Sequence, residues 1–229
     1  MPGTIVVVGY GPGVSAAVAE RFGAEGFAVA LVARSAERAG AGVEALKARG
    51  VNAAAFRANA GDPASIREAI DAARAALGPV AVLHWNAIGG VGLGDLMGAE
   101  TIAVAGVFDV AVTGLVAAVQ EALPDLRAAK GAVLVTNGAF GELDPQMDQA
   151  AIALGASGVA LANAAKHKLV GLLATRLAGE GVYVGEVMIA GMVQGTPSDR
   201  GQGAIEGARI ADAFWQLYRA RADTYARVS

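Results

Sequence analysis

Residues 6–15 read VVVGYGPGVS, and this segment determines how the rest of the chain is interpreted. The valines belong to a short apolar run, residues 4–8, which predicts a buried strand, and an Ala-rich helical pattern follows at 16–25. Glycines between a strand and a helix allow a sharp turn that brings backbone N–H groups close to a pyrophosphate. A merely tight turn would use the same glycines, but the strand–loop–helix context favours a dinucleotide site.

Strands and helices alternate along the rest of the chain. We expect further strands at residues 27–32, 51–56, 80–85, 132–136 and 182–189. Further helices are expected at residues 36–49, 63–77, 99–126, 150–178 and 205–221, with Ser35 and Asp62 as caps of the first two. This order predicts an α/β protein with a single-domain Rossmann fold over residues 1–229. Its doubly wound parallel sheet would be covered by helices on both faces.

Composition excludes several kinds of site. The chain has 229 residues, a net charge of −3 and no cysteine, which excludes a disulfide framework, a thiolate nucleophile and a cysteine-ligated metal. With only two histidines we expect no metal site, and a pI near 5.4 predicts no surface for nucleic acid. The longest uncharged stretch, residues 75–94, contains Pro79, Asn86 and several glycines, which favour a strand and a loop over a membrane span. We therefore expect a soluble cytoplasmic protein without a signal peptide.

The end of the second expected strand bears on the choice of nucleotide. A site selective for NAD usually has an acidic residue here, which accepts hydrogen bonds from the ribose hydroxyls. Ala33 cannot accept them, whereas the guanidinium of Arg34 can pair with a 2′-phosphate. NADP(H) is therefore the expected cofactor. The alternative is that Arg34 is a solvated residue before a helix.

Together these features resemble the short-chain dehydrogenase/reductase family over nearly the whole chain. The glycine loop keeps the family spacing at Gly9 and Gly13, with Ser15 at the third glycine. The pair Asn59-Ala60 stands at the family's adenine-contacting Asp-Val, and residues 189–197 (IAGMVQGTP) stand at the segment that contacts the nicotinamide end. The resemblance implies the following cofactor contacts: Gly9, Pro12, Gly13, Val14, Arg34, Ser35, Asn59, Ala60, Asn86, Ala87, Ile88, Lys166, Gly191, Val193 and Thr196.

The positions that this family uses for catalysis carry other residues here. The family's Tyr-x-x-x-Lys motif aligns with Ala162 and Lys166, its serine with Gly138, and its helix asparagine with Ala111. The resemblance thus implies an atypical member that keeps the lysine and lacks most of the catalytic tetrad. Without the tyrosine, general acid catalysis of about 10²–10⁴-fold would be missing.

Other side chains near these positions are candidates for the missing roles. Asn137 and Asn163 can donate hydrogen bonds to a carbonyl, although neither can act as an acid or base at neutral pH. Lys166 can bind the ribose or, if burial lowers its pKa, donate a proton. We therefore take Lys166, Asn137 and Asn163 as the candidate catalytic residues.

Several further residues have both a structural and a functional interpretation. His84 lies within a strand, where core packing is the simpler role, and His167 is expected to point away from Lys166 and to pack or lie on the surface. Residues 197–203 are polar and rich in glycine, as expected for a mobile lid. Three residues are either substrate contacts or part of a helix cap around Pro145: Asp144, Gln146 and Asp148.

Two functions agree best with this pattern. The first is an atypical oxidoreductase that transfers hydride between NADPH and a small carbonyl, alcohol or imine. The second is a non-catalytic NADP(H)-binding protein that acts as a sensor or interaction partner. The expected helix at 99–126 is apolar on more than one face, so we also expect a homodimer or homotetramer.

Overall fold

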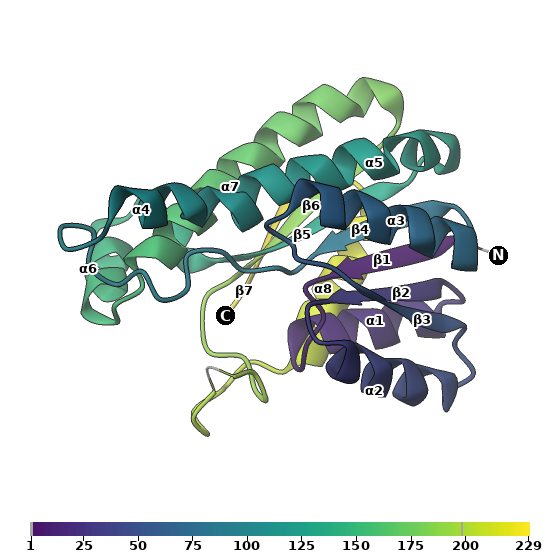
Figure 1. Ribbon diagram of the computed structural model, residues 1–229, viewed down its shortest axis with the longest axis horizontal. Helices are drawn as coiled ribbons and strands as arrows, with labels where there is room; N and C mark the ends of the chain where they lie inside the picture. The colour runs from purple at the N-terminus through teal and green to yellow at the C-terminus, as the bar shows by residue number, and fades with distance from the viewer. Residues whose placement is uncertain (1, 198) are drawn as a thin grey trace.

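The computed structural model describes residues 2–197 and 199–229, and its strands form one seven-stranded sheet (Figure 1). All neighbouring strands are parallel, in the order β3-β2-β1-β4-β5-β6-β7. The strands are β1 (Thr4–Val8), β2 (Ala28–Ala33), β3 (Ala53–Arg57), β4 (Val80–Trp85), β5 (Ala132–Gly138), β6 (Tyr183–Ile189) and β7 (Tyr225–Val228). The main helices are α1 (Val14–Ala24), α2 (Ala36–Lys47), α3 (Pro63–Leu77), α4 (Thr101–Phe108), α5 (Gly114–Ala129), α6 (Pro145–Ala153), α7 (Ser157–Leu177) and α8 (Gly207–Ala220). The predicted Rossmann-like α/β fold is confirmed.

Helices cover both faces of the sheet (Figure 1). Successive residues of β1 point to opposite faces, so Ile5 and Val7 enter one core while Val6 and Val8 enter the other. Helices α1, α2 and α8 pack on the first face, and α3, α5 and α7 pack on the second. From β1 the chain builds the sheet in one direction to β3 and then in the other from β4. The strand order therefore reverses between β1 and β4, and the loops that follow these two strands lead to opposite faces of the sheet. Open α/β sheets commonly bind their ligands at such a point.

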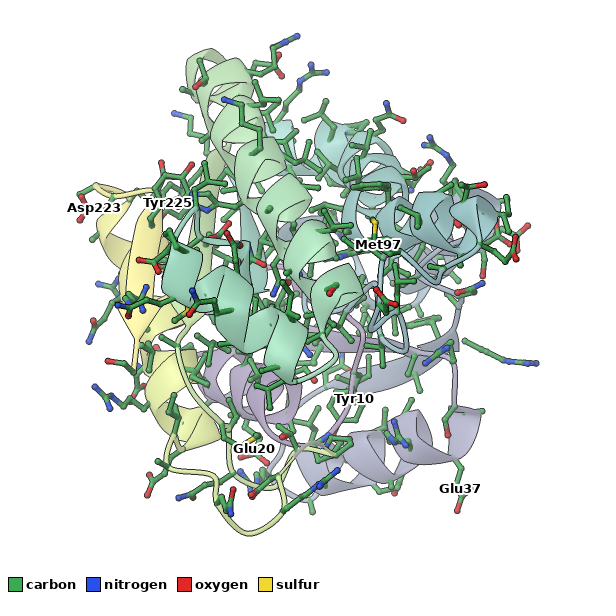
Figure 2. The ribbon with its side chains drawn as sticks, turned by 90° about the vertical axis from the view of Figure 1, so that its left-hand side faces the viewer. Tyr10, Glu20, Glu37, Met97, Asp223 and Tyr225 are labelled. Atoms are coloured by element: carbon green, nitrogen blue, oxygen red, sulfur yellow. The ribbon has the colours of Figure 1, made fainter. Side chains whose placement is uncertain are left out.

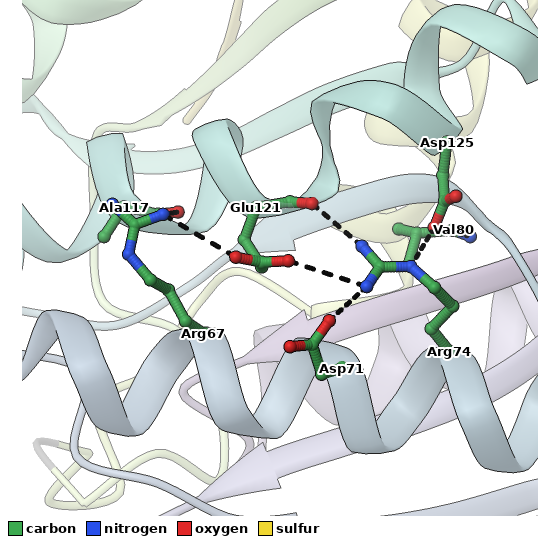
Figure 3. A network of polar contacts seen from close by, with 7 residues as sticks. All are labelled: Arg67, Asp71, Arg74, Val80, Ala117, Glu121 and Asp125. Atoms are coloured by element: carbon green, nitrogen blue, oxygen red, sulfur yellow. Dashed lines mark hydrogen bonds and ion pairs between the residues drawn. The ribbon is translucent and has the colours of Figure 1, made fainter.

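A network of charged side chains ties α3 to α5 on the second face (Figure 3). Arg74 donates from Nε to Oδ2 of Asp125 at 2.7 Å and from Nη2 to the carbonyl oxygen of Glu121 at 2.8 Å. The same Asp125 oxygen accepts the N–H of Val80 at 3.1 Å, which fixes the start of β4. Nearby, Nη1 of Arg67 lies 3.7 Å from Oε2 of Glu121. The network therefore links two helices and a strand away from the carboxyl edge of the sheet.

One of the expected helices is interrupted, so its prediction as a single helix was wrong, and another is continuous but contains a π-helical turn. The segment expected at 99–126 consists of α4, a π-helical turn at Asp109–Thr113, and α5. The segment expected at 150–178 consists of α6 and α7, separated by Gly155 with a φ of +61°. Hydrophobic periodicity revealed neither the extra residue of the π-helical turn nor the left-handed conformation of Gly155. In both segments the apolar pattern continues in the helix that follows the irregular residues.

Strand β7 was not predicted from the sequence. It has four residues, it pairs with β6, and only Val228 among them is buried. One buried valine is too weak a signal for a strand, because an edge strand of this kind is defined by pairing with its neighbour.

The continuous helical segment from Thr101 to Ala129 is long and apolar enough to cross a membrane, by length and composition alone. Its second half, α5, packs instead in the core of the second face through Leu115, Val119 and Leu126. Its first half, α4, leaves Ile102 79% exposed. The apolar character of α5 is thus explained by packing on the sheet, whereas α4 presents an apolar surface.

Candidate functional site

The predicted site residues follow the carboxyl ends of the strands and meet at one edge of the sheet. Gly9 follows β1, Arg34 follows β2 and Asn86 follows β4, while Gly138 ends β5 and Gly191 lies just beyond β6. Because all the strands are parallel, these ends lie on the same side of the sheet. Segments that are distant in the sequence are thereby brought together.

The loop after β1 closely approaches two other segments of the site. A Cβ on Gly9, whose φ is +82°, would lie 2.5 Å from the nitrogen of Ala87, and a Cβ on Gly13, whose φ is +85°, would lie 2.6 Å from Cγ2 of Thr196. Glycine is therefore required at both positions, for its conformation and for its small size. Asn86 strengthens the first contact, since its Nδ2 donates to the carbonyl oxygen of Gly9 at 3.2 Å.

Two side chains of the loop hold it from inside. Ser15, which stands where the family has a third glycine, is fully buried; its Oγ donates to the carbonyl oxygen of Gly11 and accepts the N–H of Gly11, both at 2.9 Å. Tyr10 extends from the loop to α2, where its ring lies against Gly42 (Figure 2). The loop is thus fixed on its inner side, while Pro12 at its tip stays exposed.

The helix that follows this loop begins without a side-chain cap. Its N-cap is Gly13, and its first residue is Val14. By contrast, Ser35 caps α2 by accepting the N–H of Arg38 at 3.2 Å, and Asp62 caps α3 by accepting the N–H of Ala64 at 3.0 Å. The first-turn N–H groups of α1 therefore remain available to an anion, at the positive end of the helix dipole.

A cavity of about 440 Å³ lies beyond the ends of β2 and β3. Its lining residues are Arg34, Arg57, Ala58, Asn59 and Ser65. Two guanidinium groups border this cavity and none of its lining residues is acidic, which suits a phosphate dianion. The structure thus places the predicted residues Arg34 and Asn59 at one cavity.

Sequence analysis missed three residues of this cavity, Arg57, Ala58 and Ser65. A single arginine at the end of a half-exposed strand carries no pattern of its own. Only the pairing of β2 with β3, which sets Ala33 opposite Arg57, brings this side chain beside Arg34. Ser65 joins the cavity through the loop after β3, where its Oγ accepts the N–H of Asn59 at 3.1 Å.

The segment after β6 is anchored near the start of α8. Val193 forms a β-bridge with Ile205, and Oγ1 of Thr196 donates to the carbonyl oxygen of Val193 at 2.9 Å. Of the predicted lid at 197–203, Ser198 lies outside the described residues. In the described part, Oδ1 of Asp199 accepts the N–H groups of Gly201 and Gly203, both at 2.8 Å. The mobility of this segment stays a prediction.

The two candidate asparagines lie together but use their carboxamides differently. Asn137 donates from Nδ2 to the carbonyl oxygen of Asn163 at 3.0 Å, and its Oδ1 accepts the N–H of Gly138 at 3.0 Å. Its side chain thus holds β5 to α7 and is 3% exposed, which does not support the expected contact with a substrate carbonyl. The carboxamide of Asn163 makes no hydrogen bond with any described residue.

Lys166 is a buried cation, and it lies near a buried carboxylate. Burial lowers the pKa of Lys166 to about 8, and the negative charge of Glu186 partly opposes this shift. Glu186 is fully buried on β6, and its Oε1 lies 2.8 Å from Nδ1 of His167. His167 also packs against the ring of Tyr225, which Figure 2 labels, with 4.8 Å between ring centroids. The structural role expected for His167 is confirmed.

Two further polar candidates, His84 and Asp144, have structural roles in this fold. His84 is fully buried, with Nε2 3.1 Å from Oγ1 of Thr136, and burial lowers its pKa to about 3. Asp144 caps α6, because its Oδ1 accepts the N–H groups of Gln146 and Met147. The core role of His84 and the cap at Asp144 are therefore confirmed.

Comparison with known families identifies the chain. A sequence model described as short chain dehydrogenase matches residues 3–203. The chain belongs to the short-chain dehydrogenase family. No curated protein sequence matches it.

Solved structures of other short-chain dehydrogenases share this fold over the whole chain. A Burkholderia cenocepacia J2315 enzyme in complex with NADP is 25% identical, with a TM-score of 0.84 and coverage of 100% of this chain and 97% of that chain. A Rhodopseudomonas palustris short-chain dehydrogenase is 20% identical, with a TM-score of 0.81 and coverage of 100% and 99%. A Pseudomonas aeruginosa PAO1 short chain oxidoreductase, described as containing an atypical catalytic center, is 22% identical, with a TM-score of 0.83 and coverage of 99% and 95%.

Two residues that sequence analysis expects at the family's catalytic positions, Ala111 and Ala162, lie in an apolar cluster. Ala111, in the π-helical turn, and Ala162, on α7, pack together with Val107. Ala111 is fully buried and Ala162 is 1% exposed. The space around both methyl groups is therefore closed by neighbouring side chains, and neither position offers a polar group to a ligand.

Proposed function

We propose that this short-chain dehydrogenase binds NADP(H) as one domain over residues 1–229 and transfers hydride between NADPH and a small carbonyl, alcohol or imine. The observation that carries the proposal is the cavity bordered by Arg34 and Arg57. A 2′-phosphate there would receive charge-assisted hydrogen bonds from both guanidinium groups, whereas NADH would leave both without a partner. The relative crystallised with NADP supports the same choice.

The residues of the carboxyl edge fit the rest of the nucleotide. The uncapped N-terminus of α1, with Gly13 and Val14, would receive the pyrophosphate, and Asn59 with Ala60 would lie beside the adenine. Lys166 would donate to the nicotinamide ribose. The bound nucleotide supplies the hydride, while these residues hold it and exclude water from its reactive end.

Titration with NADPH and with NADH tests the proposal. Quenching of tryptophan fluorescence reports the binding. Trp85 is fully buried in the core directly before Asn86, so it is close to the proposed site without being exposed to it. Arg34→Ala and Arg57→Ala should each weaken NADPH binding about tenfold or more and leave NADH binding nearly unchanged. Arg176→Ala, on α7 where its guanidinium pairs with Glu180, is the control. Equal losses for both nucleotides would contradict the assignment of the cavity.

A second candidate function is a non-catalytic NADP(H)-binding protein, a sensor or interaction partner. The apolar packing of Ala111 against Ala162 favours it, because a proton donor is missing from both positions. Oxidation of NADPH in the presence of a panel of small aldehydes, ketones and imines separates the two functions. Turnover above the rate of the Lys166→Met variant supports the oxidoreductase, and NADPH binding without any turnover supports the non-catalytic protein.

We also propose that the protein is cytoplasmic, binds neither nucleic acid nor membrane, and forms a homodimer or homotetramer. Three exposed apolar residues lie on α4 and on the loop before it: Val91, Met97 and Ile102, which are 72%, 90% and 79% exposed. Figure 2 labels Met97. A second copy packed on this face would remove that surface from water. Light scattering should give a dimeric or tetrameric mass that Ile102→Glu lowers. A monomeric mass of the unaltered protein would contradict this proposal.

A further inference from the structure

Glu186 is a buried carboxylate to which the proposed function gives no role. It is fully buried on β6, and its Oε1 lies 2.8 Å from Nδ1 of His167 on α7. Its other oxygen, Oε2, is also buried and has no hydrogen-bond partner within residues 2–197 and 199–229. Unpaired buried polar atoms are rare in folded proteins, and a part in proton transfer is one reason for retaining one.

The strands on either side of β6 leave Glu186 without a cation. On β5 the opposite residue is Val135, and on β7 it is Tyr225. Burial and the negative charge of Glu186 raise the pKa of Tyr225, so its phenol stays neutral near pH 7. Arg227, the next residue of β7 on the same face as Tyr225, is engaged by Glu142. Among the described residues, α7 therefore supplies the cations that Glu186 faces.

These two residues of α7, Lys166 and His167, differ in their access to water. Lys166 is only 3% exposed, whereas 40% of the His167 side chain is exposed. The negative charge of Glu186 acts on Lys166 and raises its pKa against the larger effect of burial. Glu186 thus interacts with a buried lysine through its charge and with a half-exposed histidine by direct contact.

The helical turn before Lys166 is apolar. Ala162, four residues earlier on α7, packs with Val107 and Ala111. None of these three side chains can carry a proton. In the part of the chain that the structure describes, a connection between Lys166 and solvent through ionisable side chains therefore runs through Glu186 and its histidine.

We propose that Glu186 and His167 carry protons between Lys166 and solvent. In the reduction of a carbonyl, Lys166 gives one ammonium proton to the oxygen of the group that accepts hydride, and is left as a neutral amine. His167 takes a proton from water at Nε2 and releases its Nδ1 proton to Glu186, whose carboxyl group then gives a proton to the amine. One proton thus enters from water for each proton that leaves with the product.

The residue types suit these steps. Histidine changes its charge between pH 5 and 8, and because Nδ1 of His167 faces Glu186, Nε2 is the ring nitrogen left for exchange with water. The route requires that the flexible stem of Lys166 brings its amine to the free Oε2 of Glu186. It rests on the proposed oxidoreductase, in which Lys166 lies at the reactive end of the nucleotide. Neither Glu186 nor His167 touches a ligand, so both act through Lys166.

Exchange of the lysine ammonium hydrogens with water tests this route without requiring turnover. Nuclear magnetic resonance follows the ammonium group of Lys166 in protein labelled with nitrogen-15 at lysine Nζ, and Lys166→Met identifies its signal. Glu186→Gln and His167→Phe should each slow the exchange about tenfold or more near neutral pH, because a general base is removed. Tyr225→Phe keeps the ring that packs against His167 and is the matched control, which should leave the exchange unchanged.

A merely structural role of the pair predicts the opposite result. Destabilisation would open the buried lysine to water, and loss of the Glu186 charge would make the ammonium group more acidic, so both changes speed the exchange. Exchange that is as fast or faster in both variants would overturn the route. Urea midpoints show whether the variants are folded. If Glu186→Gln does not fold, His167→Phe, which leaves Glu186 in place, decides.

Addition of NADP⁺ separates this proposal from the proposed function. Backbone resonances of Gly13 and Val14 report whether the nucleotide binds. Slowed exchange in the variants of a protein that binds no NADP⁺ supports the route and contradicts the proposed cofactor. Binding of NADP⁺ together with unchanged exchange leaves the nucleotide site intact and overturns the route.

Discussion

Two loops at the same edge of the sheet contain glycines that serve opposite purposes. After β1, Gly9 and Gly13 bring neighbouring segments close while the N-terminus of α1 is left uncapped. After β5, Gly138 and Gly141 allow α7 to approach until Asn163 fills the space above the strand. The first loop leaves the backbone donors of α1 without a side-chain cap, and the second loop is covered by α7. A glycine-rich loop is therefore not a ligand site by itself, because the element that packs on it decides whether its N–H groups stay accessible.

The largest expected effect comes from closing the first loop. Gly9→Ala should lower the free energy of unfolding by about 2–4 kcal/mol, since alanine is strained at a φ of +82° and its Cβ would collide with the backbone of Ala87. Urea unfolding measures the loss, and NADPH titration should show that binding fails as well. Gly11→Ala is the matched control, because its Cβ would meet no atom closer than 4.0 Å. Equal losses for the two variants would contradict the close approach at Gly9.

The next effect concerns the buried cation behind the second loop. Because burial lowers the pKa of Lys166 to about 8 from 10.5, the unfolded chain binds this proton more tightly than the folded chain does. Stability should therefore rise as the pH increases from about 8 to 10.5, and below pH 8 the full cost of burying the charge is present. Lys166→Met should be more stable by about 1–3 kcal/mol at pH 7, with the advantage disappearing above pH 10.5.

Chemical unfolding at several pH values measures this difference, and the exposed neighbour variant Lys168→Met is the control. If Lys166 binds the ribose, the stabilised variant should also bind NADPH more weakly. A variant that is less stable than the unaltered protein at pH 7 would show that Glu186 compensates the charge more than burial penalises it.

A third effect tests whether the apolar cluster beside the second loop is closed. Ala162→Tyr should lower the free energy of unfolding by about 2 kcal/mol and add no turnover beyond that of the unaltered protein, because Ala162 is packed against Ala111 with no room for a ring. Ala72→Tyr, on the exposed side of α3, provides the control for a tyrosine in a helix. A stable Ala162→Tyr variant that oxidises NADPH with a ketone faster than the unaltered protein would show that the second loop remains open to its ligand.

The smallest effect lies away from both loops. Arg74→Met removes the contacts between α3 and Asp125 on α5 that Figure 3 shows, and should cost about 1 kcal/mol of stability because these side chains are partly exposed. The affinity for NADPH should not change, since the network lies far from the carboxyl edge. A large loss of affinity would mean that the position of α5 controls the first loop.

The sequence alone determined the fold class and the local geometry of the loop after β1. The run VVVGYGPGVS joins a strand, a turn and a helix that are adjacent in the chain, so local spacing is enough to place Gly9, Gly13 and the start of α1 together. The same holds for Arg34 and for the caps at Ser35 and Asp62, which act within a few residues of their own position.

Only the tertiary structure decided features that depend on contacts between distant segments. Arg57 joins Arg34 through the pairing of β3 with β2, and β7 exists because β6 offers an edge. The distinction between Asn137 and Asn163 likewise depends on how closely α7 approaches β5, which no spacing in the sequence reports. Local patterns encode turns, caps and periodicity, whereas the direction in which a buried carboxamide points is set by packing between elements that meet only in the folded chain.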